Sequence, residues 1–241
     1  MTELLREMDR IIVYMREHVQ SYARLIQDLF GESGKSLAVF GAVLTESFRA
    51  DSDLIRSVLV VDRVDLPLLR RLAKEGQMLG KLGITAPLIM TPEHIRTSLD
   101  TFPLELMEIQ QRHATLFGKD NFNDLAFDPA HVRLQCEREL KRILITLRQG
   151  LLASAGRERL VPVMEQGAAD DLTRTLRGLL WLRGQKDFKA PMDVLTAMES
   201  LTGRKLLGLR VALHSADTST WGDFDALYRD VEALGELVNA W

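Results

Sequence analysis

The chain has 241 residues, of which 46% are hydrophobic and 27% charged, with 31 Lys and Arg against 34 Asp and Glu. This composition is that of an ordinary globular protein and excludes a disordered, collagen-like or disulfide-scaffold chain. The formal net charge of −3 argues against a dedicated nucleic-acid surface, since such surfaces usually carry a basic excess. A single cysteine, Cys136, and the absence of any apolar run near the roughly 20 residues of a membrane span predict a cytoplasmic protein with no membrane partner.

The first predicted element is a long N-terminal helix. From Leu4 to Phe30 the apolar residues recur in steps of three and four, which keeps one helical face apolar, and Gly31 ends the pattern. Such a helix packs either on its own domain or on a second copy of the chain. We favour the first alternative, and polar substitutions at Ile11 and Met15 would separate the two.

Short runs typical of strands then alternate with helical segments. One helix is expected from Leu66 to Leu79 with Asp65 as its N-cap, a second begins at Thr91-Pro92, and a third follows Phe102-Pro103. Alternating strands and helices indicate an α/β layer with a small mixed sheet of four or five strands. The predicted strands are Ser36 to Phe40, Ser57 to Val61, Ala86 to Met90 and His113 to Phe117.

After residue 128 the strand pattern disappears and amphipathic helices follow one another, which predicts an all-α helical bundle. We therefore divide the chain into an α/β domain over residues 1–128, which includes the N-terminal helix, and a helical domain over residues 129–241. The expected helices of the second domain are His131 to Leu152, Asp170 to Leu182, Pro191 to Leu201 and Asp223 to Val238.

The segment from Leu37 to Val61 is the one that points to chemistry. A strand ends at Gly41, the polar segment that follows contains Asp51, Ser52 and Asp53, and a second strand comes after it. A turn at the glycine could let a phosphate approach backbone amides, and Asp53 could bind a divalent cation. The ordinary alternative is a turn in which Asp and Ser cap backbone donors, with Gly41 supplying a positive φ.

This segment resembles the nucleotidyltransferase superfamily, which has the DNA polymerase β-like fold and includes kanamycin nucleotidyltransferase. The family pattern is a strand, then Gly-Ser, and later Ser-Asp-x-Asp at the start of the next strand. Gly41 matches the glycine, Ser52 the serine and Asp53 the first metal-binding aspartate. The resemblance implies a nucleotide site at Gly41, Ala42 and Ser52 and a Mg²⁺ site at Asp53, with Asp51 as a compensating ligand.

The same segment departs from the family at the metal site. Ala42 stands where the phosphate-binding serine belongs, Glu46 where a second glycine is common, and Ile55 where the second metal-binding aspartate belongs. Nucleotidyl transfer in the family needs two metal ions about 4 Å apart, held by two or three carboxylates. An isoleucine cannot coordinate a cation, and Ala86 to Met90, the strand expected to carry the third carboxylate, has no acid.

The resemblance continues from Phe102 to Phe117 and into the helix that follows His131, and it covers about residues 20 to 185. Basic residues on that helix either line a cleft that binds an anion or form a solvated face paired with Glu137 and Glu139, the alternative we favour. Cys136 lies on its apolar face and is interpreted as a buried hydrophobe. The basic residues are Arg133, Arg138, Lys141, Arg142 and Arg148.

Three functional hypotheses remain open. The first is a nucleotidyltransferase-like protein with a degenerate two-metal site that acts by binding a nucleotide or a partner protein. The second is an active Mg²⁺-dependent transferase that moves a nucleoside monophosphate from a nucleoside triphosphate to a hydroxyl of a small molecule or protein. The third is a dimeric interaction module whose cleft is vestigial. No catalytic residue is assigned, and no cofactor is expected unless the protein is active.

Overall fold

The computed structural model describes residues 6–46, 48–51, 53–186, 188, 190–214 and 218–239. The chain divides into two compact units. We call the first, Met1–Leu99 with Glu105–Ala126, the α/β unit, and the second, Asp100–Leu104 with Phe127–Trp241, the helical unit. A boundary between independently folding domains near residue 128 stays a prediction, and residues 100–104 lie with the helical unit.

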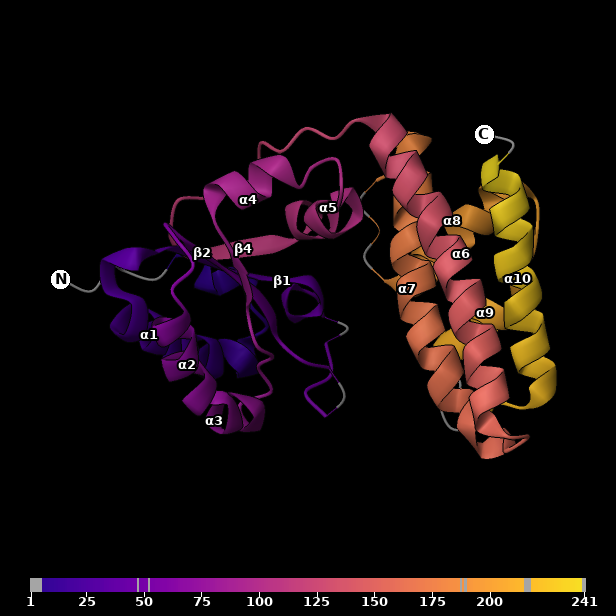
Figure 1. Ribbon diagram of the computed structural model, residues 1–241, viewed down its shortest axis with the longest axis horizontal. Coiled ribbons are helices and arrows are strands. Elements are labelled where there is room, and N and C mark those ends of the chain that lie inside the picture. The colour runs from indigo at the N-terminus through magenta and orange to yellow at the C-terminus, as the bar shows by residue number, and fades with distance from the viewer. Residues whose placement is uncertain are drawn as a thin grey trace. The chain divides into compact units, whose positions relative to one another are not determined.

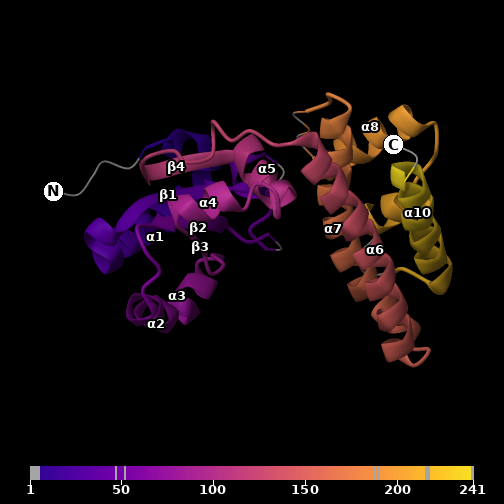
Figure 2. The ribbon, with the colours of Figure 1, turned by 45° about the horizontal axis from the view of Figure 1, so that its top comes forward.

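The α/β unit is built on a small mixed sheet, as the sequence predicts. Its strand order is β3-β2-β1-β4, with β1 antiparallel to both neighbours and β2 parallel to β3 (Figures 1 and 2; β3 is labelled in Figure 2). The third strand is shorter than predicted, because Ala86 and Pro87 precede it and only three residues pair with β2. The strands in the described residues are β1 (Gly34–Phe40), β2 (Arg56–Val61), β3 (Leu88–Met90) and β4 (His113–Gly118).

The predicted continuous helix from Leu4 to Phe30 is wrong. The backbone is extended at Ile11 and also non-helical at Ile12 (ψ 134°), and the Arg16 guanidinium donates a hydrogen bond to the Ile11 carbonyl (2.9 Å) across the break. The break leaves Ile11 and Met15 buried within the α/β unit, which confirms packing on the chain's own core. Leu4 and Leu5 lie outside the described residues, and from residue 6 onward two 3₁₀ turns and one helix replace the predicted element: η1 (Met8–Arg10), η2 (Val13–Met15) and α1 (Arg16–Phe30).

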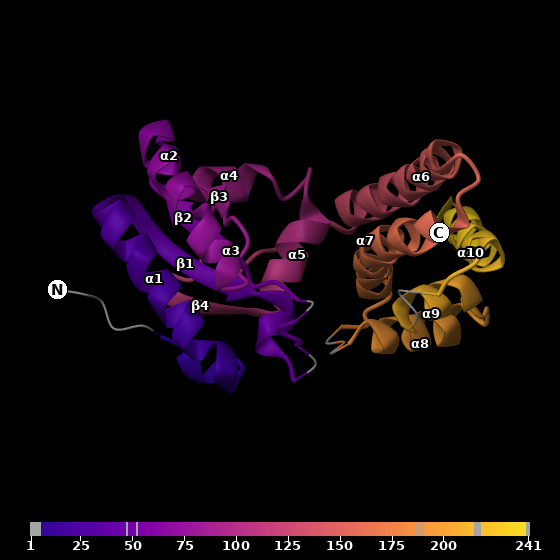
Figure 3. The ribbon, with the colours of Figure 1, turned by 90° about the horizontal axis from the view of Figure 1, so that it is seen from below.

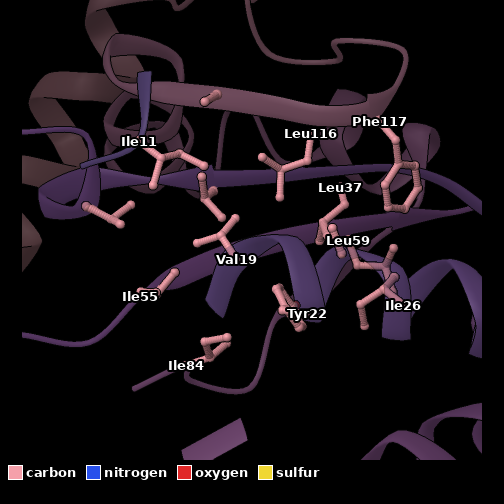
Figure 4. Packing of buried hydrophobic residues seen from close by; sticks show 14 of the residues in the cluster. Ile11, Val19, Tyr22, Ile26, Leu37, Ile55, Leu59, Ile84, Leu116 and Phe117 are labelled. Carbon is pink, nitrogen blue, oxygen red and sulfur yellow. The ribbon is translucent and has the colours of Figure 1, made fainter. Parts of the chain in front are cut away.

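Helix α1 covers one face of the sheet. Its residues Val19, Tyr22 and Ile26 are fully buried and point toward Leu37 and Leu59 of the two central strands (Figure 4). The Tyr22 hydroxyl lies 2.8 Å from the hydroxyl of Ser57, and burial raises the pKa of Tyr22 to about 12. Odd-numbered positions at the start of β2 therefore face α1, and the even-numbered positions face the other side of the sheet.

The described segment between β2 and β4 contains four further helices, and α4 lies on the side of the sheet opposite α1 (Figures 1 and 3). The Asp65 carboxylate accepts a hydrogen bond from the Leu68 amide (3.1 Å), which confirms the predicted N-cap. The single helix predicted from Leu66 to Leu79 is wrong, because the chain breaks at Glu75 before a helix-weakening glycine. The observed helices are α2 (Leu66–Lys74), α3 (Gly76–Lys81), α4 (Pro92–Thr97) and α5 (Pro103–Gln111).

The helical unit is all-α, as predicted, and α6, α7 and α10 run side by side within it (Figure 2). The structure differs from expectation in two ways: α7 begins at Val161, well before Asp170, and α9 is a helix that the sequence pattern does not predict. Cys136 is fully buried and burial raises its pKa to about 12, which confirms a packing role. The helices are α6 (Pro129–Ser154), α7 (Val161–Leu182), α8 (Pro191–Thr202), α9 (Leu207–His214) and α10 (Trp221–Asn239), with a short η5 turn (Glu158–Leu160).

None of the helices within the described ranges is long and apolar enough to cross a membrane.

A buried acid in the helical unit gives a testable pH dependence. Burial raises the pKa of Glu165 above its ordinary 4.5, the neighbouring Asp223 carboxylate adds to the rise, and the Ser219 hydroxyl opposes it. The folded unit therefore binds this proton more tightly than the unfolded chain. As pH rises above 4.5, Glu165 lowers the free energy of unfolding by a growing amount. Glu165→Gln is expected to raise the melting temperature clearly at pH 8 and little at pH 4.

All three tryptophans lie after residue 128, so their fluorescence reports unfolding of the helical unit. Melts of wild type and Glu165→Gln followed at pH 4, 6 and 8 give the comparison directly. Glu236→Gln, an exposed change on α10, is the matched control. An equal effect of Glu165→Gln at all three pH values would show that its carboxylate does not titrate differently on folding.

Candidate functional site

The Gly41 turn lies where three strand ends meet. Gly41 directly follows β1 and has a φ of +82°, a conformation that favours glycine, and its amide donates a hydrogen bond to the Arg112 carbonyl (3.0 Å). The preceding residue, Phe40, is paired with Arg56 of β2 on one side and with His113 of β4 on the other. The sheet edge at Gly41 therefore gathers the end of β1 and the beginnings of β2 and β4.

The predicted nucleotide-binding residues fall partly at this edge. Ala42 is the exposed second residue of η4 (Gly41–Leu44), the short 3₁₀ turn that leaves β1. Its side chain is a methyl group, so it offers no hydroxyl to a phosphate. Ser52, the third predicted residue, lies outside the described residues.

The two candidate metal ligands, Asp51 and Asp53, lie in the turn before β2. The Asp53 carboxylate accepts a hydrogen bond from the Arg49 amide (2.8 Å), and the Asp53 amide donates to the Arg49 carbonyl (2.7 Å). The Asp51 carboxylate lies 3.6 Å from the Arg49 guanidinium, with 77% of its side chain exposed. Both acids are therefore engaged with Arg49 in a local turn, the arrangement that the ordinary interpretation of this segment predicts.

Ile55, which the sequence resemblance aligned with the family's second acid, is part of the hydrophobic core. Its side chain is fully buried in the cluster that includes Tyr22 and Ile84 (Figure 4). Its amide donates to the Gly83 carbonyl (2.7 Å) and its carbonyl accepts from the Thr85 amide (3.0 Å). The backbone pairing fixes the direction of this side chain, so an acid at position 55 would also point into the core.

The donor set does not fit a two-metal centre. Within the part of the chain that the structure describes, no three His, Cys, Asp or Glu side chains come together to hold a metal ion. Strand β3, which the resemblance implies should carry the third carboxylate, has the sequence Leu-Ile-Met and contains no acid. The carboxylates of Asp51 and Asp53 remain, and each contacts Arg49, Asp53 through the backbone amide and Asp51 through the guanidinium.

An arginine that the sequence analysis missed lies at the glycine turn. Arg56 begins β2, stacks its guanidinium over the Phe40 ring at 4.8 Å from the centroid, and forms an ion pair with Glu108 of α5. A Cβ built on Gly41 would lie 2.6 Å from its Nη2 atom. The signal available in the sequence was a single charge at the start of the otherwise apolar or small-residue strand Arg-Ser-Val-Leu-Val-Val.

The basic residues of α6 form a solvated, ion-paired face. Lys141 lies 2.6 Å from the Glu137 carboxylate, and Arg142 lies 2.7 Å from both Glu139 and Asp171. These pairs confirm the interpretation favoured from the sequence. Arg133 also approaches Glu137 (3.5 Å), and the Arg148 guanidinium donates to the Tyr228 hydroxyl (2.6 Å).

Comparison with known proteins gives a match in structure and none in sequence. No family model matches the chain, and no curated protein matches it. Among solved structures, spectinomycin adenyltransferase AAD(9) from Enterococcus faecialis, determined with ATP and spectinomycin, is similar with a TM-score of 0.61. The match covers 92% of this chain and 98% of that one at 10% sequence identity. The chain therefore has the nucleotidyltransferase fold, an α/β part followed by a helical part, as the sequence resemblance implied.

Proposed function

We propose that this protein binds a nucleotide at the sheet edge formed by Gly41 and Arg56 and has lost two-metal nucleotidyl transfer. The observation that carries the proposal is the full burial of Ile55 at the position of the second metal-binding acid. Two-metal transfer needs carboxylates that hold both ions and activate the attacking hydroxyl. The backbone pairing of Ile55 with Ile84 directs the side chain at position 55 into the core, so this position supplies no metal ligand.

Several features support nucleotide binding at the retained edge. The glycine turn keeps its positive φ, and a cationic side chain lies against it. The similar adenyltransferase was determined with ATP, which makes ATP the first ligand to test. A nucleotide ligand and a single buried free thiol both fit a cytoplasmic location. If no nucleotide binds, a partner protein becomes the ligand to seek.

Thermal unfolding with ATP, GTP, CTP and UTP, each in EDTA and in Mg²⁺, tests the proposal. A ligand that binds only the folded state stabilises it by about 2.7 kcal/mol at one hundred times its Kd. We expect at least one nucleotide to raise the melting temperature of the α/β unit in EDTA, and Asp53→Ala to leave that rise unchanged. Asp124→Ala, an exposed change in the same unit, is the control for loss of one negative charge.

A stabilisation that requires Mg²⁺ and disappears in Asp53→Ala would contradict the proposal and restore the active transferase. The absence of any shift at millimolar nucleotide would also contradict it.

A further inference from the structure

The Arg56 guanidinium is packed directly against the Gly41 turn. The 2.6 Å between its Nη2 atom and a Cβ built on Gly41 is too short for any real side chain, so only glycine leaves the guanidinium in this place. The glycine therefore serves two purposes at once, because it also supplies the φ of +82°. A cation is therefore held against the Gly41 turn, for which the sequence resemblance implies phosphate binding.

Two neighbours hold the guanidinium in position. The Phe40 ring, which is almost fully buried, lies beneath it, and the Glu108 carboxylate pairs with it from α5. Even so, 37% of the Arg56 side chain and 23% of the Glu108 side chain remain exposed. The cation is thus both pre-positioned and accessible, and the planar fork of a guanidinium can bind a phosphate with two parallel hydrogen bonds.

The charge required by a phosphate chain is supplied here by a side chain. In a two-metal site the ions bridge and neutralise the phosphate oxygens. The neighbouring acids do not assemble such a site, while Arg56 contributes a permanent positive charge. Glu108 carries the opposite charge, and its carboxylate accepts a hydrogen bond from one of the two terminal nitrogens of the same guanidinium.

We propose that Arg56 binds the phosphate groups of a nucleoside di- or triphosphate at Gly41 without a metal ion, and that Glu108 competes with them for the guanidinium. This inference rests on the proposed nucleotide-binding function and names the residue that carries it. A phosphate that binds the Arg56 guanidinium either displaces the Glu108 carboxylate or shares the guanidinium with it. Removing the charge of Arg56 should therefore lower the affinity for the phosphates, and removing the charge of Glu108 should raise it.

The test is calorimetric titration of ATP, inorganic tripolyphosphate and adenosine in EDTA. Arg56→Gln is expected to weaken ATP and tripolyphosphate binding at least about tenfold, the loss typical of charge-assisted hydrogen bonds. Glu108→Gln is expected to tighten both ligands severalfold. Adenosine, which has no phosphate, should respond to neither change. Arg63→Gln, an exposed change just after β2, and Glu32→Gln, an exposed change just before β1, are the charge-matched controls.

Each outcome decides the matter. If wild type binds ATP in EDTA and Arg56→Gln retains that affinity, this inference fails while the proposed function stands. If Arg56→Gln and Glu108→Gln weaken binding equally, the pair is structural and the inference fails as well. If wild type binds neither ATP nor tripolyphosphate, this inference fails, and the proposed function fails with it only if GTP, CTP and UTP also give no thermal shift. Should Arg56→Gln not fold, Glu108→Gln alone decides, because tightening supports the competition and weakening or no change contradicts it.

Discussion

Ile55→Asp is expected to destabilise the α/β unit by at least about 3 kcal/mol and to create no metal site. The substitution restores the acid that the nucleotidyltransferase family has at this position, yet the side chain points into the core beside Tyr22 and Ile84. A carboxylate there loses its hydration without gaining a partner. It either stays ionised at a high cost or takes up a proton, so the loss should be smaller at pH 4 than at pH 8.

Hydrogen exchange of the β1 and β2 amides measures the stability of this unit without interference from the helical unit. Leu54→Asp introduces the same acid one residue earlier, on a side chain that is 56% exposed, and is expected to change stability by no more than about 0.5 kcal/mol. Ile55→Val should cost about 0.5 to 1.5 kcal/mol. Selective stabilisation of Ile55→Asp by Mg²⁺ would show instead that position 55 can reach a metal ion, and the account of the site would fail.

Gly208→Ala is expected to destabilise the helical unit by about 3 kcal/mol, although alanine is the better helix former. A Cβ at Gly208 would collide with the backbone of Ala226 and Leu227, so α9 and α10 must move apart. Such a movement also breaks the hydrogen bond that the Leu209 amide donates to the buried Asp230 carboxylate (3.0 Å). The effect is large because a rigid backbone, not a flexible side chain, blocks the new methyl group.

Urea unfolding followed by tryptophan fluorescence measures this loss. Gly235→Ala is the matched control, because Gly235 lies within α10 and a Cβ there meets nothing within 4 Å. That variant should be stabilised by up to about 1 kcal/mol. If Gly208→Ala were also neutral or stabilising, the close crossing of α9 and α10 would be wrong.

Much of the fold could be predicted from local sequence patterns. The paired strands and the caps at Asp65 and Thr91 follow from signals that act over a few residues, and the structure confirms them. The errors arise where long-range packing prevails. Helical periodicity continues through Ile11 and Ile12, but the chain turns there to bury Ile11. Helix α9 was missed because an eight-residue segment beginning Leu-Gly depends on its contact with α10.

The site was less predictable than the fold. The family resemblance directed attention to the Gly41 turn and to the acids at Asp51 and Asp53, and it implied that Ile55 stands where the second metal-binding acid belongs. It could not reveal Arg56, because the feature that distinguishes this arginine is its contact with Glu108, which lies 52 residues further along the chain. A pairing between a strand and a distant helix leaves no periodic signal in a single sequence.

Calorimetric titration of wild-type protein with ATP, first in EDTA and then in Mg²⁺, shows whether the site holds phosphates without a metal ion. The proposed site holds the phosphates with a guanidinium, so ATP should bind in EDTA at least as tightly as in Mg²⁺, where the metal already neutralises part of the phosphate charge. Binding that appears only when Mg²⁺ is present would contradict the account, because it would require a metal site that Ile55, Asp51 and Asp53 do not provide.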